Sequence, residues 1–390
     1  MQINAKIRKI EYELFLADEL EEYNFDDNFN INQAKPVFKL KFNDSVFSVS
    51  KWVSPKRTRS YPYARVYNSL QVPKKITIIP VLKDEGIKGD RDYLQWDTVS
   101  LMSLLDVYVI LAYYTKAEPS KRSNKITNQQ FDNEFIKEQI KKIASFHSSA
   151  LHWNVAQLEN IENLIEKAKE SYKKISEELN VTLHSEVGIN RFLKRIKNSF
   201  EEFKKFSREK AKEAQNREFV TIQPKEHLSG QDFKKAKITI TNFLGGEYYF
   251  TCDEVKIVDD KILLIEGKHS QNGIFPSIDD IKDGLLKMIL YTNLEDVTVN
   301  NHYFKPLPTL KLTAKKINLD YDINLFETLM LTPYLIPNEI NNKVDLMINS
   351  IIENIKKRNP RINEGLLRRL FKEALTNKFN VIIEKAEDED

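Results

Sequence analysis

Residues 250–268 read FTCDEVKIVDDKILLIEGK. Apolar residues recur on both sides of the polar run Asp259–Lys261, and they are densest just before the final three residues. Short apolar runs separated by polar turn residues are typical of paired strands. This stretch therefore predicts a β-hairpin, with one strand at 247–258 and the next at 262–266.

Three chemically active side chains fall on this hairpin. Asp253 lies on the first strand, Glu266 lies on the second, and Lys268 follows two residues later. Because alternate residues of a strand share a face, Glu266 and Lys268 point to the same side of the sheet. We therefore expect two carboxylates and one lysine to converge at one edge, where burying them is costly unless they serve a purpose.

Two carboxylates beside a lysine suit a magnesium site. Mg²⁺ binds few protein oxygens and keeps several waters. When bound, it lowers the pKa of a water and neutralises charge on a phosphate, and a neighbouring lysine adds positive charge for both. The ordinary alternative is an exposed hairpin on which Glu266 and Lys268 form a surface ion pair of little energetic value.

The texture of the sequence changes along the chain and indicates four segments. Short apolar runs and prolines predict a mixed α/β region at 1–125, and apolar residues spaced three and four apart predict a helical region at 126–217. Strand-like alternation predicts the core that carries the hairpin at 218–315, and 316–390 reads as mainly helical. The expected fold class is mixed α/β (α+β), with a central mixed sheet flanked by helices.

Further elements are expected around the hairpin. Ser277 is a favourable N-cap and is followed by acidic residues, which predicts a helix that runs to about Tyr291. Apolar alternation predicts strands at 296–299 and 309–312 after it, and a helix at 189–214 before the hairpin.

This arrangement resembles the PD-(D/E)XK nuclease family. Asp253 is followed, after twelve residues, by Glu266–Lys268, and the order of helix, hairpin, helix and strand is similar to the family core. The resemblance covers about 190–313, roughly a third of the chain. Cys252 stands where the family motif has a proline.

The resemblance implies a role for each residue of the motif. Asp253 and Glu266, with the carbonyl oxygen of Gly267, would hold Mg²⁺. Lys268 would position the attacking water and help to deprotonate it. A glutamate on the preceding helix often completes such a site, and this chain offers two candidates, Glu201 and Glu202.

The same resemblance implies a restriction-endonuclease-like core and a type II restriction enzyme, which hydrolyses phosphodiester bonds of double-stranded DNA at specific sites with Mg²⁺. The flanking regions, 1–217 and 314–390, would recognise a short DNA sequence. A two-fold symmetric DNA site favours a homodimer, and a companion DNA methyltransferase would be encoded separately. Two alternatives stay open: a structure-specific repair or junction nuclease, and a non-catalytic DNA-binding protein with a degenerate nuclease core.

Positive charge is concentrated in three segments. The chain has 60 Lys and Arg against 57 Asp and Glu, a net +3 that excludes a polycation. Segment 51–91 has ten basic and three acidic residues, 191–237 has fourteen and seven, and 356–378 has eight and two. Such local excesses favour a polyanion partner. The candidate DNA-binding residues are Lys56, Arg57, Arg59, Arg65, Arg191, Lys194, Arg195, Lys356, Lys357, Arg358 and Arg361.

Composition excludes several classes of protein. A single cysteine cannot build a disulfide scaffold, a zinc ribbon or a cysteine-ligated iron–sulfur cluster, and it fits a reducing compartment. The most apolar stretch, 101–114, is shorter than the roughly 20 residues that cross a bilayer, and the N-terminus lacks a signal-peptide core. No phosphate-binding loop of a motor is present. We expect a cytoplasmic protein without membrane contact.

Two other polar clusters have ordinary explanations. His147, His152 and Asn154 are similar to an HNH-nuclease set, but about 100° per helical residue separates the two histidines by some 140°, which favours packing or capping. Asp90–Asp92 and Asp97 follow two glycines and indicate a charged loop. The next place to look, should the hairpin not be the site, comprises Asp97, Asp106 and Lys116.

Overall fold

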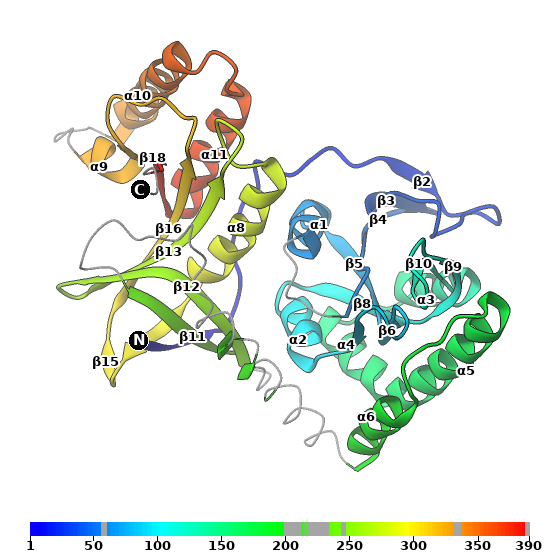
Figure 1. Cartoon of the computed structure of the whole chain (residues 1–390). Coiled ribbons are helices and arrows are strands. Elements are labelled where there is room, and N and C mark those ends of the chain that lie inside the picture. Colours follow the sequence, from blue (N-terminus) through cyan, green and yellow to red (C-terminus); the bar gives the residue numbers. More distant parts are fainter. Residues whose placement is uncertain are drawn as a thin grey trace. The chain divides into compact units, whose positions relative to one another are not determined.

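The chain forms two compact units in a computed structural model (Figure 1). The first unit draws on Met1–Ala17, Gln215–Phe243 and Tyr249–Asp390, and the second on Asp18–Ala214 and Leu244–Tyr248. Residues 1–17 thus belong with the hairpin, and the helical region shares a unit with most of the N-terminal region. The structure describes residues 1–55, 61–198, 209, 212–213, 215–216, 234–242, 247–330 and 337–386.

A nine-stranded mixed sheet forms the centre of the first unit, in the order β15-β14-β1-β11-β12-β13-β16-β18-β17. Its strands are β1 (Gln2–Ile7), β11 (Lys234–Asn242), β12 (Glu247–Val258), β13 (Lys261–Ser270), β14 (Glu295–Val299), β15 (His302–Tyr303), β16 (Lys305–Ala314), β17 (Ile323–Asn324) and β18 (Asn380–Lys385). β1 is parallel to β11 and β13 is parallel to β16, whereas β12 and β13 are antiparallel. The predicted mixed sheet is therefore confirmed.

Helices flank this sheet, as the sequence predicted. α8 (Ile278–Tyr291) packs against β13 and β16, while α9 (Leu325–Met330) and α11 (Glu364–Asn377) pack against β18. α10 (Pro337–Arg358) packs against α11. Ser277 caps α8 as expected, because its Oγ accepts a hydrogen bond from the Asp280 amide at 3.2 Å.

The predicted hairpin is also confirmed. β12 and β13 pair in register around Asp259, whose φ of 54° lies in the left-handed region that Asp tolerates in tight turns. The strands predicted at 296–299 and 309–312 correspond to β14 and the centre of β16.

The strands β1 and β18 were not predicted, and neither were the two-residue strands β15 and β17. β1 lies between β14 and β11, although the residues beside it in the sheet are more than two hundred positions away in sequence. β18 lies in the segment that reads as mainly helical, and it pairs parallel with β16. Its apolar run, Val381–Ile383, directly follows a helix, and a run this short does not distinguish a strand from the end of a helix.

A five-stranded sheet in the order β2-β3-β4-β5-β8 forms the core of the second unit. β3 and β4 form an antiparallel hairpin, and the other neighbours are parallel. The strands are β2 (Glu22–Asn24), β3 (Val37–Phe42), β4 (Ser45–Lys51), β5 (Lys74–Pro80) and β8 (Val107–Ala112), and the crossover helices are α1 (Tyr61–Ser69) and α2 (Trp96–Leu104).

Two small sheets and four helices surround this core. The pairs are β6 (Leu82–Asp84) with β7 (Arg91–Tyr93), and β9 (Tyr114–Pro119) with β10 (Ile126–Phe131). The amphipathic pattern predicted helices after residue 126, and these are α3 (Asn133–Ala144), α4 (Ala150–Glu159), α5 (Ile161–Leu179) and α6 (Val187–Asn198). The segment that reads as helical therefore begins with a strand, β10.

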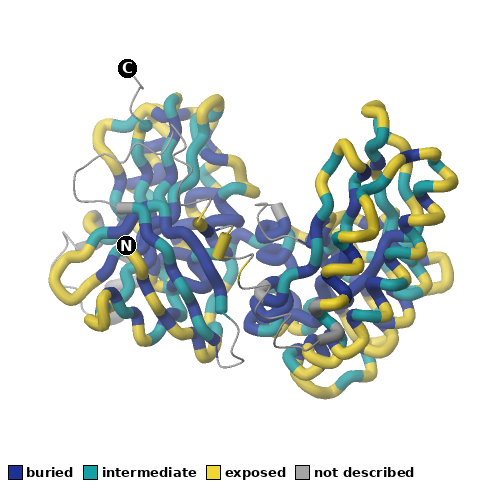
Figure 2. Tube along the Cα trace, turned by 60° about the horizontal axis from the view of Figure 1, so that its bottom comes forward, coloured by how far each residue is buried: buried dark blue, intermediate teal, exposed yellow. Residues whose placement is uncertain are grey.

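Burial follows the two sheets. Figure 2 shows buried backbone, in dark blue, along the central strands of each unit. Every residue of β8 is buried, which explains why its sequence is a continuous apolar run rather than an alternating one. Within the described part of the chain, no helix combines the length and the apolar character needed to span a bilayer.

Candidate active site

The strands of the hairpin separate where Asp253 and Glu266 lie. The β12–β13 ladder ends with Glu254 opposite Ile265. One step further, the same register sets Asp253 opposite Glu266, so both side chains point to one face of the sheet. At this point the backbone amide of Gly267 donates to Asp253 Oδ2 at 2.8 Å, which holds the aspartate against the second strand.

Cys252 is buried beside this separation. Its Sγ lies 3.2 Å from the carbonyl oxygen of Glu254 and 3.3 Å from that of Ile265, so the thiol proton is donated to the strand backbone. Burial raises the pKa of the thiol well above its ordinary value, which keeps the group neutral and unreactive. Cys252 therefore supports the hairpin rather than taking part in chemistry.

Four charged side chains form a row between β13 and α8, which we call the charged row. Glu266 Oε1 lies 3.0 Å from Lys268 Nζ, and Glu266 Oε2 lies 2.7 Å from Lys287 Nζ. Lys268 Nζ also contacts Asp283 Oδ2 at 2.5 Å. Asp283 and Lys287 are four residues apart on α8 and so share one face of the helix. The order along the row is Asp283, Lys268, Glu266 and Lys287.

The charged row is largely shielded from water. The side chain of Glu266 is 2% exposed and that of Lys268 is 15% exposed. Burial acts to raise the pKa of Glu266, but the charges of Lys287 and Lys268 hold it below its ordinary value. Burial acts to lower the pKa of Lys268, yet Glu266 and Asp283 raise it. Glu266 is therefore a carboxylate, and Lys268 an ammonium, at neutral pH.

Gly284 leaves the space in which Lys268 lies against α8. A Cβ at this position would lie 2.7 Å from Leu310 Cδ1 and 3.2 Å from Lys268 Cε. Both distances are shorter than ordinary van der Waals contact, so any larger residue would push against the lysine stem. α8 thus supplies charged partners and also makes room for the lysine that they hold.

Asp253 and Glu266 fit a hard divalent cation. They are carboxylates on one face of the hairpin, and Asp253 is half-buried rather than sealed from water. The amide and carbonyl of a strand residue point to the same edge, so the Gly267 carbonyl faces the Asp253 side. The described residues contain no group of three His, Cys, Asp or Glu that could hold a metal. A metal here would therefore complete its shell with waters, as Mg²⁺ commonly does.

The predicted DNA-binding residues of the second unit differ in their surroundings. Arg65 is half-buried and donates from its guanidinium to the Lys51 carbonyl at 2.6 Å. Arg191 and Lys194 are exposed on α6, whose buried face includes Phe192. The remaining candidates lie outside the described part of the chain: Lys56, Arg57 and Arg59, with the two glutamate candidates Glu201 and Glu202. The backbone of Arg195 is described, but its side chain is not.

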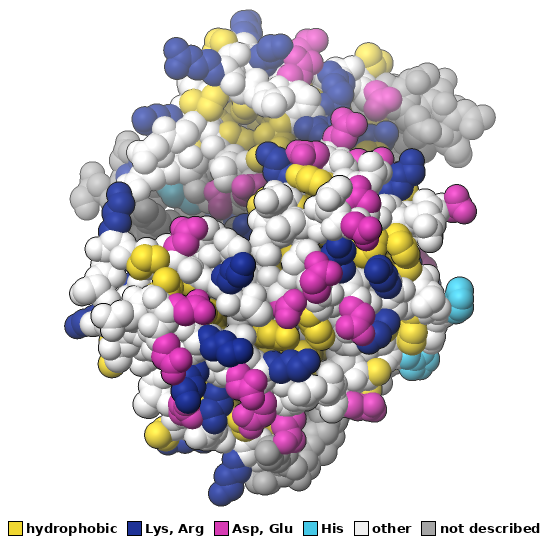
Figure 3. All heavy atoms as spheres, turned by 90° about the vertical axis from the view of Figure 1, so that its right-hand side faces the viewer, with side chains coloured by type: hydrophobic (Ala, Val, Ile, Leu, Met, Phe, Trp, Pro, Cys, Tyr) yellow, Lys and Arg dark blue, Asp and Glu magenta, His cyan; other side chains and the backbone are white. Residues whose placement is uncertain are grey.

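The C-terminal cations belong to the first unit. Lys356 Nζ lies 2.6 Å from a Glu364 carboxylate oxygen, and Arg358 pairs with Asp320. Lys357 and Arg361 are exposed between these pairs. The face in Figure 3, which belongs mainly to the second unit, likewise intermixes basic and acidic side chains. Positive charge is therefore partly compensated locally.

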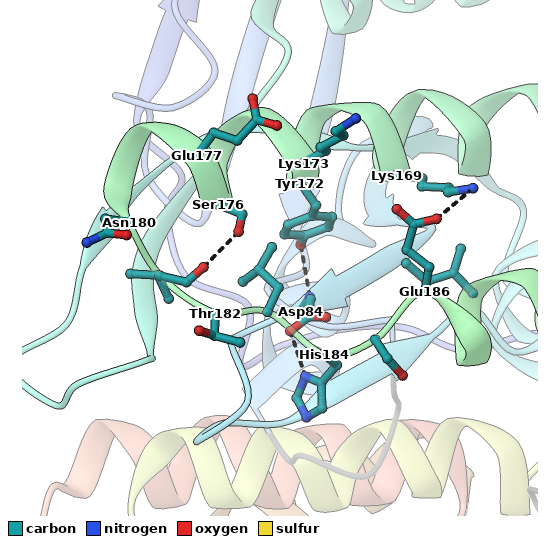
Figure 4. Close-up of a pocket in the computed structure, with 14 residues that line it drawn as sticks. Asp84, Lys169, Tyr172, Lys173, Ser176, Glu177, Asn180, Thr182, His184 and Glu186 are labelled. Atoms are coloured by element: carbon teal, nitrogen blue, oxygen red, sulfur yellow. Dashed lines mark hydrogen bonds and ion pairs between the residues drawn. The ribbon is translucent and has the colours of Figure 1, made fainter.

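A polar pocket of about 400 Å³ lies in the second unit, between α5, the loop after it and Asp84 (Figure 4). Asp84 is buried there, and its Oδ1 lies 2.8 Å from His184 Nδ1. The Asp84 amide donates to the Tyr172 hydroxyl at 3.0 Å, and Lys169 pairs with Glu186 at 3.0 Å. These contacts connect α5 and the loop after it to β6, so the pocket has a structural explanation.

The other polar candidates are not brought together as a site. Asp92 accepts a hydrogen bond from Ser54 Oγ at 2.7 Å, and the side chain of Asp97 lies outside the described part. Asp106 accepts from the Ala150 amide at the start of α4. Among the described contacts, none joins Asp106 to Lys116.

Asn154 has the packing role that was predicted for its cluster, whereas His147 and His152 are exposed. Asn154 is buried, accepts from the Val109 amide at 2.7 Å and donates to the Val107 carbonyl at 2.9 Å. It therefore fixes α4 to β8. His152 Nδ1 lies 2.6 Å from Ser148 Oγ at the beginning of the helix.

Asp283 and Lys287 were not predicted as site residues. The available signal was a pair of charged residues one helical turn apart in a helix whose remaining positions are mostly buried and apolar. Charges on a buried face need partners, and the charged residues of the motif on the preceding strand are candidates for that role. The spacing could have indicated the pair, but not which strand residue each would contact.

Comparisons with models of known protein families, with curated proteins and with solved structures each gave no significant match.

Proposed function

We propose that this protein is a Mg²⁺-dependent endonuclease of the PD-(D/E)XK type that cleaves double-stranded DNA, and specifically a type II restriction enzyme. The observation that carries the proposal is the hairpin on which Asp253 lies opposite Glu266, with Lys268 on the same face. A helix, α8, and a strand parallel to β13 follow that hairpin. This is the arrangement that the motif requires.

The geometry supports a division of labour among the three motif residues. Asp253 and Glu266 would hold the metal, which when bound lowers the pKa of a water and neutralises charge on the phosphate. Lys268 is held as an ammonium by Glu266 and Asp283. Its part is therefore to orient the attacking water and the phosphate by hydrogen bonds and charge, rather than to accept the proton of the water.

The remaining parts of the proposal concern DNA recognition. Exposed cations of both units would contact backbone phosphates. These are Arg191 and Lys194 on α6, Lys357 in the last turn of α10, and Arg361 shortly after it. The second unit does not carry the hairpin motif, and it would read the DNA sequence. A homodimer would cut both strands of a two-fold symmetric site, with a separately encoded DNA methyltransferase to protect the host.

Substitutions in the motif test this proposal. Lys268→Ala and Asp253→Ala should each reduce Mg²⁺-dependent cleavage of plasmid DNA at least about a hundredfold, while retention of DNA on a gel in Ca²⁺ stays within about threefold of wild type. Lys311→Gln is the matched control, because Lys311 is half-buried on the opposite face of the same sheet, where it pairs with Glu254 and Glu384. Undiminished cleavage by both motif variants would remove the site assignment.

The DNA substrate separates this function from a repair nuclease. A restriction enzyme cuts a linear duplex at fixed positions, whereas a junction or repair nuclease cuts a branched or damaged duplex and spares the same sequence when it is fully paired. Incubating wild type with matched linear and four-way-junction substrates, labelled at one 5′ end, distinguishes the two.

A further inference from the structure

Lys287 is the second cation that the chain itself places on Glu266. Its Nζ lies 2.7 Å from Glu266 Oε2, while Lys268 occupies Oε1 at 3.0 Å. Lys268 is shared with Asp283, at 2.5 Å. Lys287 and Lys268 are therefore the two counter-charges of the one carboxylate that is both buried and a proposed metal ligand.

The net charge of the site changes from negative to positive when a divalent ion is added. Asp253, Glu266 and Asp283 carry three negative charges, and Lys268 and Lys287 carry two positive charges, a net of −1. A divalent ion beside Asp253 and Glu266 brings the net to +1, which is costly in a largely buried site. One phosphate group of DNA restores neutrality.

We propose that Lys287 is a built-in competitor of the metal, which keeps metal binding weak until DNA is present. This rests on the proposed nuclease function. Its ammonium pairs with Glu266 when no phosphate is nearby, and it turns to a DNA phosphate oxygen when metal and DNA bind together. The side chain is suited to this exchange, since its 12% exposure exceeds the 2% of its partner Glu266, and since the four-carbon stem of a lysine is flexible. Lys287 is thus a positioning residue that couples the two ligands.

Metal affinity in the absence of DNA is the property that this coupling controls. The test is a titration of the full-length protein with Mn²⁺, followed by calorimetry and by the loss of free Mn²⁺ paramagnetic resonance signal. Lys287→Met and Lys287→Gln should each bind Mn²⁺ at least about tenfold more tightly than wild type, since a unit charge beside a divalent ion is removed. Lys287→Arg, which keeps the charge, should stay within about twofold of wild type.

Two controls tie the effect to Glu266. Lys311→Gln removes a half-buried lysine from the other face of the sheet and should leave Mn²⁺ affinity unchanged within about twofold. In the double variant Glu266→Gln/Lys287→Gln the tightening should disappear. A short duplex should strengthen Mn²⁺ binding to wild type by about the same factor as the substitution, and much less in Lys287→Gln, because coupling between two ligands is reciprocal.

The outcomes separate this inference from the proposed function. Unchanged or weaker Mn²⁺ binding by Lys287→Met and Lys287→Gln, in protein whose circular dichroism spectrum is that of wild type, overturns the inference, even if wild type cleaves DNA. Tighter binding in both variants supports it, even if no cleavage is found, in which case only the nuclease proposal fails. Tightening that survives in the Glu266→Gln background also overturns it, because the competition would then not act at that carboxylate.

Discussion

At the scale of single residues, the candidate site depends on how α8 meets β13. Glu266 and Lys268 follow from the motif, but Asp283 and Lys287 fix their ionisation states and Gly284 fixes the path of the lysine. The opposed actions of burial and of neighbouring charge on the pKa of Glu266 are typical of functional carboxylates, although structural ion pairs show them as well. Substitutions on α8 are therefore as informative as those in the motif.

Gly284→Ala tests the packing of Lys268. The added methyl group would meet Leu310 Cδ1 and the Lys268 stem, so the lysine must shift away from Asp283. We expect cleavage to fall at least about tenfold, with a loss of stability of about 1–3 kcal/mol from overpacking. Gly365→Ala is the matched control, because the nearest atom to a Cβ at that helical position is at 3.4 Å. Wild-type cleavage by Gly284→Ala would show that the lysine does not need this path.

Glu85 gives a pH dependence in the second unit. Its carboxylate pairs with Lys83 at 2.6 Å and Lys125 at 3.0 Å. Burial opposes ionisation, but the two lysines lower the pKa of Glu85 from 4.5 to about 2. The unfolded chain then binds the extra proton between these values, so this stabilisation is present above pH 4.5 and is lost as the pH falls toward 2.

Glu85→Gln should therefore destabilise the protein at pH 7 by about 1–2 kcal/mol, after allowance for solvent screening. The difference from wild type should shrink as the pH falls from 4.5 toward 2. Urea unfolding followed by tryptophan fluorescence at a series of pH values measures both. A difference that is constant across this range would contradict the assigned ion pairs.

At the scale of elements, the sequence predicts what local periodicity encodes. The hairpin, α8 with its Ser277 cap, and the strands β14 and β16 all follow from alternation, apolar density or capping residues. β18 did not, because three apolar residues after a helix carry no period of their own. β1 did not, because its place between β14 and β11 depends on pairing across most of the chain.

Ile3→Asp tests the central position of β1. Ile3 is fully buried, whereas Asn4 is exposed on the other side of the strand. A buried unpaired charge should destabilise the first unit by more than about 3 kcal/mol, whereas Asn4→Asp should change stability by less than about 0.5 kcal/mol. Tryptophan fluorescence reports on the second unit alone, and circular dichroism reports on both; the tryptophans are Trp52, Trp96 and Trp153. A wild-type dichroism transition for Ile3→Asp would contradict the assigned sheet order.

At the scale of the whole molecule, the residues proposed to bind DNA lie outside the motif and in both units. The net charge of +3 arises from basic segments offset by acids elsewhere, and several predicted DNA-binding cations are already paired within the protein. Sequence could identify the basic segments, because counting charges needs no structure. It could not identify which cations form ion pairs, because Glu364 and Asp320 reach Lys356 and Arg358 only in the folded unit.

Arg191→Ala/Lys194→Ala tests the exposed cations of α6. Loss of two phosphate contacts should weaken DNA binding for every sequence alike and reduce the slope of log affinity against log salt by about 2. Lys121→Ala/Arg122→Ala is the control, since both residues are exposed in the β9–β10 turn, outside the three basic segments. Fluorescence anisotropy of a labelled duplex at several salt concentrations measures both. Equal slopes for the two double variants would assign α6 no role in DNA contact.

The nuclease proposal is tested most directly by incubating plasmid and phage DNA with the purified wild-type protein, with and without Mg²⁺, beside Asp253→Asn. We predict discrete fragments that require Mg²⁺ and are absent for Asp253→Asn. The proposal would be contradicted by intact DNA under all metal conditions, or by the same fragments from wild type and Asp253→Asn.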